Sequence, residues 1–256
     1  MLRRDLRYHK HPLGTSKFIK GRPLRRLQTA ENLTHLSMEQ MVSGAALFLE
    51  GWFMALVFTM LSASVDGYIS GKGARSGNGL GDGGQLFDWF CPSEYQGDER
   101  WKRMTPPNAA MLDFATARTG AVVAGRTTYE HAARWGGAGP HPTAKLFVLS
   151  HTPIPDADPR QTIVTGGIES AIGQAIDVAQ ERGKDVAIMG GVTTTEALKA
   201  GLLDEIVISV RPVLLGGGHR FFQELPDAIQ LECAGVAVNA GVTHLTYRVL
   251  GKGIAQ

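Results

Sequence analysis

Cysteine is scarce in this chain of 256 residues, which contains only Cys91 and Cys233. Neither cysteine has a partner at C-x-x-C spacing, so the sequence predicts neither a zinc site nor a disulfide framework. Long apolar runs are absent as well, because the segment 52–65 is too short to span about 30 Å of lipid. No ordered signal-peptide regions follow Met1. We therefore predict a cytoplasmic protein with no metal and no membrane partner.

Acidic residues are few near the start of the chain. Residues 1–53 contain nine Lys/Arg and four Asp/Glu, a net charge of +5, so residues 54–256 carry −3 of the total +2. Three interpretations of this basic leader stay open: a solvated disordered tail, an organelle transit peptide, or a start codon assigned too early, with Met54 as the natural start. We do not expect nucleic acid as a partner. The composition predicts one folded domain over residues 54–256.

A buried strand that ends in two glycines is the most informative local pattern. The consecutive apolar residues 186–189 suit a parallel strand covered on both faces, and Gly190-Gly191 allow a ligand to approach the backbone closely. A helix is expected next, because Thr193 and Glu196 have the spacing of a capping box. Unpaired N–H groups at a helix start attract phosphate, so the pattern favours a nucleotide-binding turn.

Strands and helices alternate along the rest of the chain. Hydrophobic patterning predicts helices over 108–119, 168–182 and 193–200. A further helix is expected from Arg126, since Thr127 and Glu130 also have capping-box spacing. Strands are predicted over 55–63, 120–125, 144–150, 162–165, 185–189, 205–210, 230–238 and 242–250. This order predicts an α/β sandwich with a mostly parallel central sheet and an antiparallel C-terminal strand.

Three predicted turns follow the carboxyl ends of strands: Gly125-Arg126-Thr127, Ser150-His151-Thr152 and Gly190-Gly191. Ligands of open α/β sheets bind outside these ends, so we expect the three turns to line one cleft. Backbone N–H groups, hydroxyls and one guanidinium would meet there, a set that suits a dianionic phosphate. The glycine-rich stretch 71–84 is expected to be either a binding loop or a surface insertion.

Several short motifs occur in a fixed order along residues 54–250. They are Ser62-x-Ser64-x-Asp66-Gly67-Tyr68-Ile69, Gly125-Arg126-Thr127-Thr128-Tyr129-Glu130, Val148-Leu149-Ser150, Gly190-Gly191, Gly201-Leu202-Leu203-Asp204-Glu205, Pro212-Val213-Leu214-Leu215-Gly216 and Thr243-His244-Leu245-Thr246-Tyr247-Arg248. Their order resembles the dihydrofolate-reductase-like fold family. More closely, the chain is similar to the C-terminal reductase domain of bacterial riboflavin-pathway deaminase-reductases, as a stand-alone member without a zinc-deaminase pattern.

The resemblance implies a three-layer sandwich and an NADPH-dependent oxidoreductase that reduces a small heterocyclic substrate. In the family, the Gly-Arg-x-Thr turn and the serine that ends a strand hold the 2′-phosphate side of NADPH. The corresponding residues are Gly125, Arg126, Thr127, Thr128, Ser150 and the neighbouring His151. The Gly-Gly turn and the helix start hold the pyrophosphate, here Gly190, Gly191, Val192, Thr193 and Thr194.

Arg126 suits this role because a guanidinium stays charged and can bind phosphate through two donors. Its other interpretation is a surface residue at a helix start. A positive charge there opposes the helix dipole, which favours an anion nearby.

Asp66 matches the aspartate that follows the first strand in riboflavin-pathway reductases, where it contacts the substrate and supports proton transfer. The resemblance therefore implies a catalytic role for Asp66. We assign Leu215, Gly216 and Gly217 to the substrate side as well. A second interpretation of Asp66 stays open, because Asp-Gly is also a turn sequence.

Departures from the family leave the substrate open. The segment 131–137 does not have the pattern rich in Asp, Pro and Arg that binds ribose phosphate in the riboflavin-pathway reductases, and Met189 stands where an acidic residue is usual. By resemblance the substrate is 5-amino-6-(5-phosphoribosylamino)uracil, in riboflavin biosynthesis. A non-catalytic nucleotide-binding protein of the same fold is one alternative. A homodimer through the late apolar strands is compatible with the sequence.

Dihydrofolate or pterin reduction is the other alternative. Asp88 and Asp113 are its candidate carboxylates, although neither has the expected sequence context, and Lys145 lies near the position of the folate clamp. Lys is a point charge rather than a two-donor fork, which disfavours this assignment. Trp89 and Trp135 either line an apolar substrate pocket or pack within the protein.

Overall fold

The computed structural model describes residues 18–19, 22–23, 25–26, 52–90 and 104–252 of the chain. Four strands of two residues come first: β1 (Phe18–Ile19), β2 (Arg22–Pro23), β3 (Arg25–Arg26) and β4 (Trp52–Phe53). The rest of the predicted leader lies outside the described residues, so the division of the chain at residue 54 stays a prediction. Within the described ranges, no helix combines the length and apolar character needed to cross a membrane.

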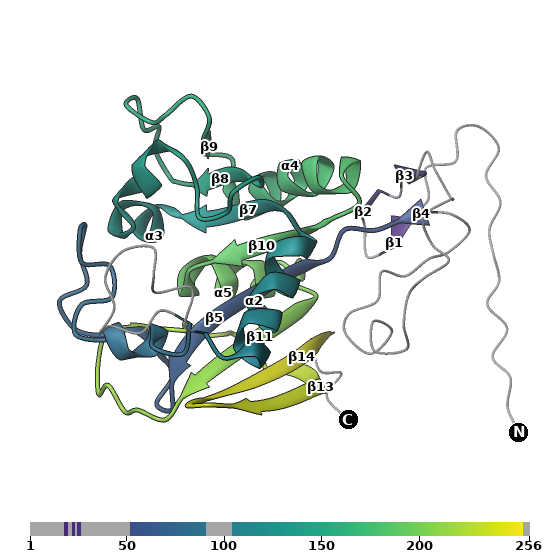
Figure 1. Ribbon diagram of the computed structural model, residues 1–256. Helices are drawn as coiled ribbons and strands as arrows, with labels where there is room; N and C mark the ends of the chain where they lie inside the picture. The colour runs from purple at the N-terminus through teal and green to yellow at the C-terminus, as the bar shows by residue number, and fades with distance from the viewer. Residues whose placement is uncertain (1–17, 20–21, 24, 27–51, 91–103, 253–256) are drawn as a thin grey trace, which may run out of the picture.

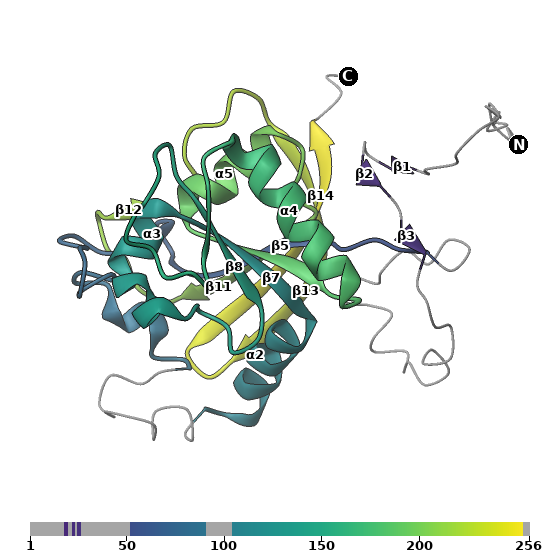
Figure 2. The same ribbon diagram turned by 90° about the horizontal axis from the view of Figure 1, so that it is seen from above.

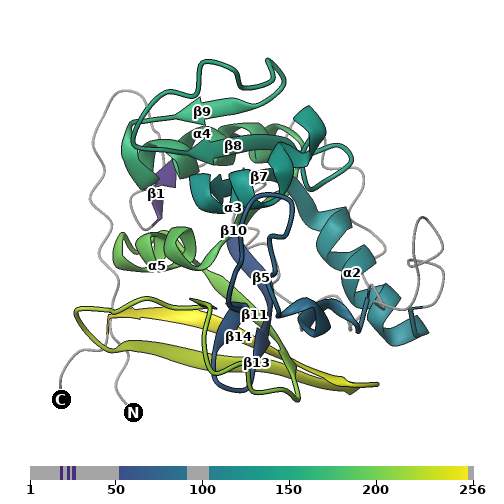
Figure 3. The ribbon, with the colours of Figure 1, turned by 90° about the vertical axis from the view of Figure 1, so that its left-hand side faces the viewer.

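The body of the protein is one eight-stranded sheet with the order β13-β14-β11-β5-β10-β7-β8-β9 (Figure 1). Its six parallel strands are β11 (Glu205–Arg211), β5 (Val57–Ser64), β10 (Asp185–Met189), β7 (Thr119–Gly125), β8 (Lys145–Leu149) and β9 (Thr162–Val164). β14 (Val242–Lys252) is antiparallel to both of its neighbours, β11 and β13 (Ile229–Asn239), as Figure 3 shows. The predicted mostly parallel sheet with an antiparallel C-terminal strand is confirmed.

Helices cover both faces of the sheet and complete the three layers (Figure 2). α4 (Gly167–Glu181) and α5 (Gly191–Lys199) pack on one face, over Val57, Val123 and Ile188. The apolar residues of α4 recur at helical spacing, and all are buried: Ile168, Ala171, Ile172, Ala175, Ile176 and Ala179. α2 (Pro106–Arg118) and α3 (Arg126–His131) lie on the other face, where Tyr129 packs against Val122 and Val148.

Both predicted capping boxes are wrong. α5 begins at Gly191, with Gly190 as its N-cap residue at φ +99°, and α3 begins at Arg126 after Gly125. Neither helix has a side-chain cap; Thr193 is buried, whereas Thr127 is exposed. A Cβ added at Gly190 would lie 2.4 Å from Thr128 Oγ1, and one at Gly125 would lie 2.4 Å from Thr193 Oγ1.

A buried ion triad ties α2 to the amino ends of two strands. Arg118 Nε donates to Asp185 Oδ2 at 2.8 Å, and its second nitrogen donates to Glu205. The three side chains are only 8–11% exposed, and the guanidinium also lies 4.1 Å from the centre of the Phe58 ring. Burying two carboxylates is tolerable only while the cation stays between them.

Replacement of Arg118 by Met should therefore lower the free energy of unfolding by about 3–5 kcal/mol, because two carboxylates remain buried without a cation. Urea denaturation measures the change. The matched control is Lys199→Met, which breaks the exposed Lys199–Glu196 pair and should cost no more than about 0.5 kcal/mol. Equal effects of the two variants would contradict the importance of the triad.

Candidate functional site

The three predicted turns meet at one edge of the sheet. β7 lies between β8 and β10, with Gly125 in register with Leu149 and Ala124 in register with Met189. Because all three strands are parallel, the segments that follow them leave the sheet on the same side. The structure thus brings the predicted cofactor residues on these turns together.

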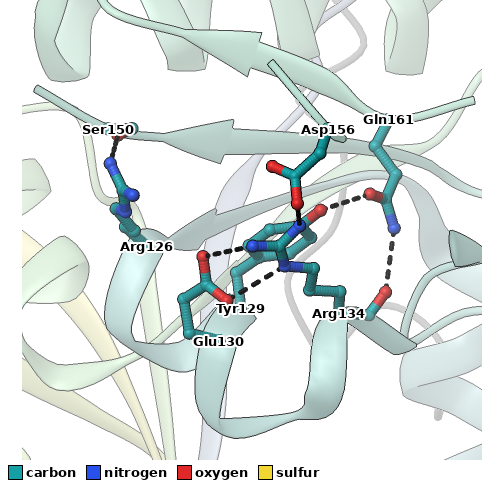
Figure 4. A network of polar contacts seen from close by, with 7 residues as sticks. All are labelled: Arg126, Tyr129, Glu130, Arg134, Ser150, Asp156 and Gln161. Carbon is teal, nitrogen blue, oxygen red and sulfur yellow. Dashed lines mark hydrogen bonds and ion pairs between the residues drawn. The ribbon is translucent and has the colours of Figure 1, made fainter. Parts of the chain in front are cut away.

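Arg126 reaches from the start of α3 to the turn after β8. Its Nη1 atom donates to Thr152 Oγ1 at 2.7 Å. The same atom donates to Ser150 Oγ at 3.3 Å, as Figure 4 shows. Ser150 is buried and donates its own hydroxyl to Thr152 O at 2.7 Å, while His151 is exposed beside it. Among the described residues no carboxylate forms an ion pair with Arg126, so neutral hydroxyls orient an exposed cation.

Most residues at the start of α5 are buried, Gly190 and Gly191 included. Thr193 and Thr194 are buried, with exposed fractions of 2% and 0%, and Thr194 Oγ1 donates to Thr59 Oγ1 at 3.4 Å. Val192 is 62% exposed. The first N–H groups of a helix have no partner within the helix, so they remain the polar groups available for an anion here.

Asp66, in the turn after β5, binds the loop that follows β11. Its carboxylate accepts hydrogen bonds from the backbone N–H groups of Gly216 at 2.7 Å and Leu215 at 3.1 Å. We call these contacts the Asp66 clamp. The structure therefore joins Asp66 to two of the three residues assigned to the substrate side, and Gly67, at φ +83°, completes the turn.

Hydrogen bonds to the Asp66 carboxylate make it more acidic than an ordinary aspartate. A hydrogen bond from the Ser64 side chain, with further ones from the amides of Gly216 and Leu215, lowers the pKa of Asp66 from 3.8 to about 2. The carboxyl group is therefore ionised at neutral pH, so it is an acceptor rather than a proton donor in this state. Asp66 remains partly exposed, so it can hold the turn and still contact a substrate.

The glycine-rich segment 71–84 folds back on itself beside the clamp. Gly71 N–H donates to Leu80 O, and Asp82 N–H donates to Lys72 O. A Cβ at Gly79 would lie 2.9 Å from His131 O, which shows how closely the segment approaches the end of α3. The structure therefore places this segment next to the strand ends.

Other candidates from the sequence lie outside this group. Trp89 is buried and donates from Nε1 to Ser62 Oγ at 2.8 Å, which makes it a packing residue. Trp135 packs against the cluster around Tyr129, and the Lys145 ammonium lies 5.4 Å from the centre of the Phe147 ring. Asp113 lies within α2. None of these four residues has a contact with the strand-end turns among the hydrogen bonds and ion pairs of the described chain.

Sequence reasoning missed a polar network just after α3. Tyr129 OH donates to Gln161 Oε1 at 2.7 Å, and Arg134 binds both Glu130 and Asp156 (Figure 4). The network accompanies a rare backbone turn, since Ala133, Arg134 and Trp135 all have positive φ. Only Gly136-Gly137 hinted at such a turn, because the three residues before them are not types that favour this conformation.

Shape alone does not mark the site. A cavity of about 500 Å³ lies elsewhere, lined mainly by apolar residues of α5, β11 and the segment 222–231. None of the strand-end residues lines it. Chemistry gives the better guide, because the strand-end turns combine an exposed guanidinium, hydroxyls and a helix start.

The fold and the site define the protein as an α/β protein with a dihydrofolate-reductase-like sheet and a polar, cation-bearing site at its strand ends. The model of the RibD C-terminal domain matches residues 55–245. The chain therefore belongs to the RibD C-terminal domain family, which confirms the resemblance. Family and fold are those of reductases.

Individual relatives agree with this family. The chain is 26% identical over 162 residues to the uncharacterized protein YwjB of Bacillus subtilis, covering 63% of this chain and 85% of that protein. The crystal structure of a putative riboflavin biosynthesis protein from Shewanella sp. PV-4 matches with a TM-score of 0.55 and 26% identity, over 77% of this chain and 99% of that one. Dihydrofolate reductase from Enterococcus faecalis, solved with NADP(H), has a TM-score of 0.48 at 16% identity, over 77% and 98% of the two chains.

The Asp66 clamp should depend on pH in a specific window. Its contribution to stability is fully present above the ordinary carboxyl pKa of 3.8 and is lost as pH falls through about 2. Carbon-13 NMR of the Asp66 carboxyl, together with the amide signals of Leu215 and Gly216, should show a shared midpoint near 2 that is missing in Asp66→Asn. A midpoint near 3.8 would contradict the clamp.

Proposed function

We propose that this chain is an NADPH-dependent reductase of a small heterocyclic substrate. The observation that supports it best is Arg126, an exposed cation held by the hydroxyls of Ser150 and Thr152, with Asp156 as an electrostatic neighbour that lies beyond ion-pair distance. The positive charge stands at the start of α3, where the helix dipole is also positive, so the site favours an added anion. The 2′-phosphate of NADPH is an anion that fits Arg126, Ser150 and Thr152.

The remaining cofactor residues fit the same ligand. The start of α5 at Gly190 and Gly191 offers backbone N–H groups to the pyrophosphate, and Gly125 and Thr128 pack against it from β7 and α3. NADPH supplies the hydride when it is bound. The protein then contributes binding and orientation, and the ionised Asp66 accepts a hydrogen bond from a substrate N–H or O–H group.

For the substrate, we propose a heterocycle related to 5-amino-6-(5-phosphoribosylamino)uracil, because the chain resembles riboflavin-pathway reductases and the Shewanella protein is described as a putative riboflavin biosynthesis protein. Dihydrofolate or a pterin is the alternative. Of the residues suggested for it, Lys145 lies over Phe147 at the start of β8, which leaves no evident clamp for a folate glutamate.

Cofactor binding is the first test. Calorimetry on the full chain should show tighter binding of NADPH than of NADH, because only NADPH carries the 2′-phosphate. Arg126→Gln should weaken NADPH binding about tenfold or more, the value of one charge-assisted contact, and leave NADH unchanged.

Arg182→Gln is the matched control, since this exposed arginine donates to Thr143 O away from the strand-end turns. Equal affinity for the two nucleotides would contradict the assignment of Arg126. Failure of both to bind would overturn the proposed function.

A second candidate, a non-catalytic nucleotide-binding protein, is favoured by one observation. Both oxygens of Asp66 already accept backbone N–H groups, as expected for a structural residue. Turnover separates the two candidates. It is measured as the loss of NADPH absorbance at about 340 nm, over a panel of aminouracil and pterin substrates.

In that assay Asp66→Asn should abolish turnover and leave the NADPH affinity nearly unchanged, because the amide keeps the shape of the side chain but loses the negative charge. Circular dichroism checks that the variant folds. Unchanged turnover would show that Asp66 is only a turn residue, and no turnover of the parent on any substrate would favour the non-catalytic candidate.

The homodimer stays a prediction. β13 is the edge strand of the sheet, and its Val236 and Val238 are 60% and 77% exposed, which provides an apolar surface for such a contact. Sedimentation equilibrium would measure the oligomeric state.

A further inference from the structure

Arg134, at the centre of the polar network after α3, has a strained backbone. Its φ is +55°, and its neighbours Ala133 and Trp135 also have positive φ, a region that residues other than glycine rarely adopt. Strain of this kind persists only where the surrounding structure enforces it, and it is frequent at functional sites. The position of the Arg134 side chain is therefore a candidate for a function that the proposed reaction has not yet used.

Buried groups enforce the strained turn. Gln161, only 6% exposed, donates from Nε2 to Arg134 O at 3.0 Å and to Ala138 O at 3.1 Å. Its Oε1 atom accepts a hydrogen bond of 2.7 Å from the hydroxyl of Tyr129, which is fully buried. The Arg134 guanidinium lies 5.7 Å from the centre of the Tyr129 ring. These contacts hold Arg134 beside α3, as Figure 4 shows.

The guanidinium of Arg134 binds two carboxylates that come from different segments. Its Nε and Nη2 atoms donate to the two carboxylate oxygens of Glu130 at 3.0 and 3.2 Å. Its Nη1 atom donates to Asp156 Oδ2 at 2.7 Å. Glu130 belongs to α3, and Asp156 lies in the segment between β8 and β9. One cation therefore engages both negative charges.

Both carboxylates are placed to compete for Arg126. Glu130 follows Arg126 by four residues in the same helix, the spacing at which opposite charges pair on a helix surface. Asp156 follows Thr152, which accepts a hydrogen bond from Arg126, by four residues. The hydrogen bond from Arg134 lowers the pKa of Asp156, and the positive charge of Arg126 lowers it further. In the described chain, however, the ion pairs of both carboxylates are with Arg134.

Two simpler roles explain the network less well. Stability is one, but the side chains of Arg134, Glu130 and Asp156 are 33%, 31% and 74% exposed, and ion pairs so open to solvent add little to it. Direct binding of a phosphate by Arg134 is the other. Three nitrogen atoms of Arg134 already donate to carboxylate oxygens, which leaves the guanidinium little capacity for a second anion.

We propose that Arg134 is a positioning residue that keeps Arg126 available for the 2′-phosphate of NADPH, because it engages the two carboxylates that would otherwise pair with Arg126. A carboxylate and a phosphate compete for the same guanidinium, since both accept its paired N–H donors. The inference rests on the proposed function. It goes further by assigning part of the preference for NADPH over NADH to a residue that does not touch the cofactor.

Calorimetry on the full chain tests this role through the affinities for NADPH and NADH. Arg134→Gln should weaken NADPH binding about tenfold, the value of one charge-assisted contact, and leave NADH binding unchanged. Arg160→Gln is the matched control, because it removes the same charge from an exposed pair with Asp158 in the segment that carries Asp156. Equal losses in the two variants would overturn the proposal, since they would reflect net charge alone.

Removal of the two carboxylates separates positioning from the simpler roles. The triple variant Arg134→Gln, Glu130→Gln, Asp156→Asn should regain the NADPH affinity of the parent, because no carboxylate is left to compete for Arg126. An affinity that stays low would mean that Arg134 binds the phosphate or only shapes the turn, and would overturn the proposal. The double variant Glu130→Gln, Asp156→Asn keeps Arg134 and should bind NADPH at least as tightly as the parent; weaker binding contradicts competition even if Arg134→Gln does not fold.

A comparison without nucleotide keeps this inference distinct from the proposed function. Crystal structures of the ligand-free parent and of Arg134→Gln should show that Arg126 leaves Ser150 and Thr152 in the variant and pairs with Glu130 or Asp156. If Arg126 stays on the two hydroxyls, the proposal is overturned. If the parent binds neither nucleotide, the proposed function fails, and this comparison still decides whether Arg134 keeps the carboxylates from Arg126.

Discussion

The arrangement of the site depends on the close contact between the ends of β7 and β10. Gly125 and Gly190 each lie against a threonine of the opposite turn, Thr193 and Thr128, at distances that no side chain would allow. This contact sets the positions of α3 and α5, because both helices begin within one residue of these glycines. The positions of Arg126 and of the first residues of α5 follow from it.

A second constraint joins the first strand to the late loop. Asp66 follows β5, yet its carboxylate is bound by residues 215 and 216, after β11. β5 and β11 are parallel neighbours, so their carboxyl ends are adjacent even though about 150 residues separate them along the chain. The clamp places His219 next to the end of α3, where it meets His131.

The charges of the site follow one pattern. Carboxylates in the described chain are mostly paired or bound by N–H groups, as in the Arg118 triad, the Arg134 network and the clamp itself. Arg126 differs from these groups, because its hydrogen-bond partners in the described chain are the neutral hydroxyls of Ser150 and Thr152, and Asp156 interacts with it only from beyond ion-pair distance.

The sequence alone determined the sheet. Continuous apolar runs indicate parallel strands that are buried on both faces, and two successive late strands indicate an antiparallel pair. It also placed Gly125, Arg126, Ser150 and Gly190 at the ends of strands, where the structure has them, since Gly125 ends β7 and the other three directly follow a strand. The capping boxes failed because Thr193 and Thr127 have the right spacing, but helix starts are decided by packing between turns. Only the tertiary structure decided the Asp66 clamp, the Arg134 network and the His131–His219 pair, because each joins segments whose separation in sequence carries no local pattern.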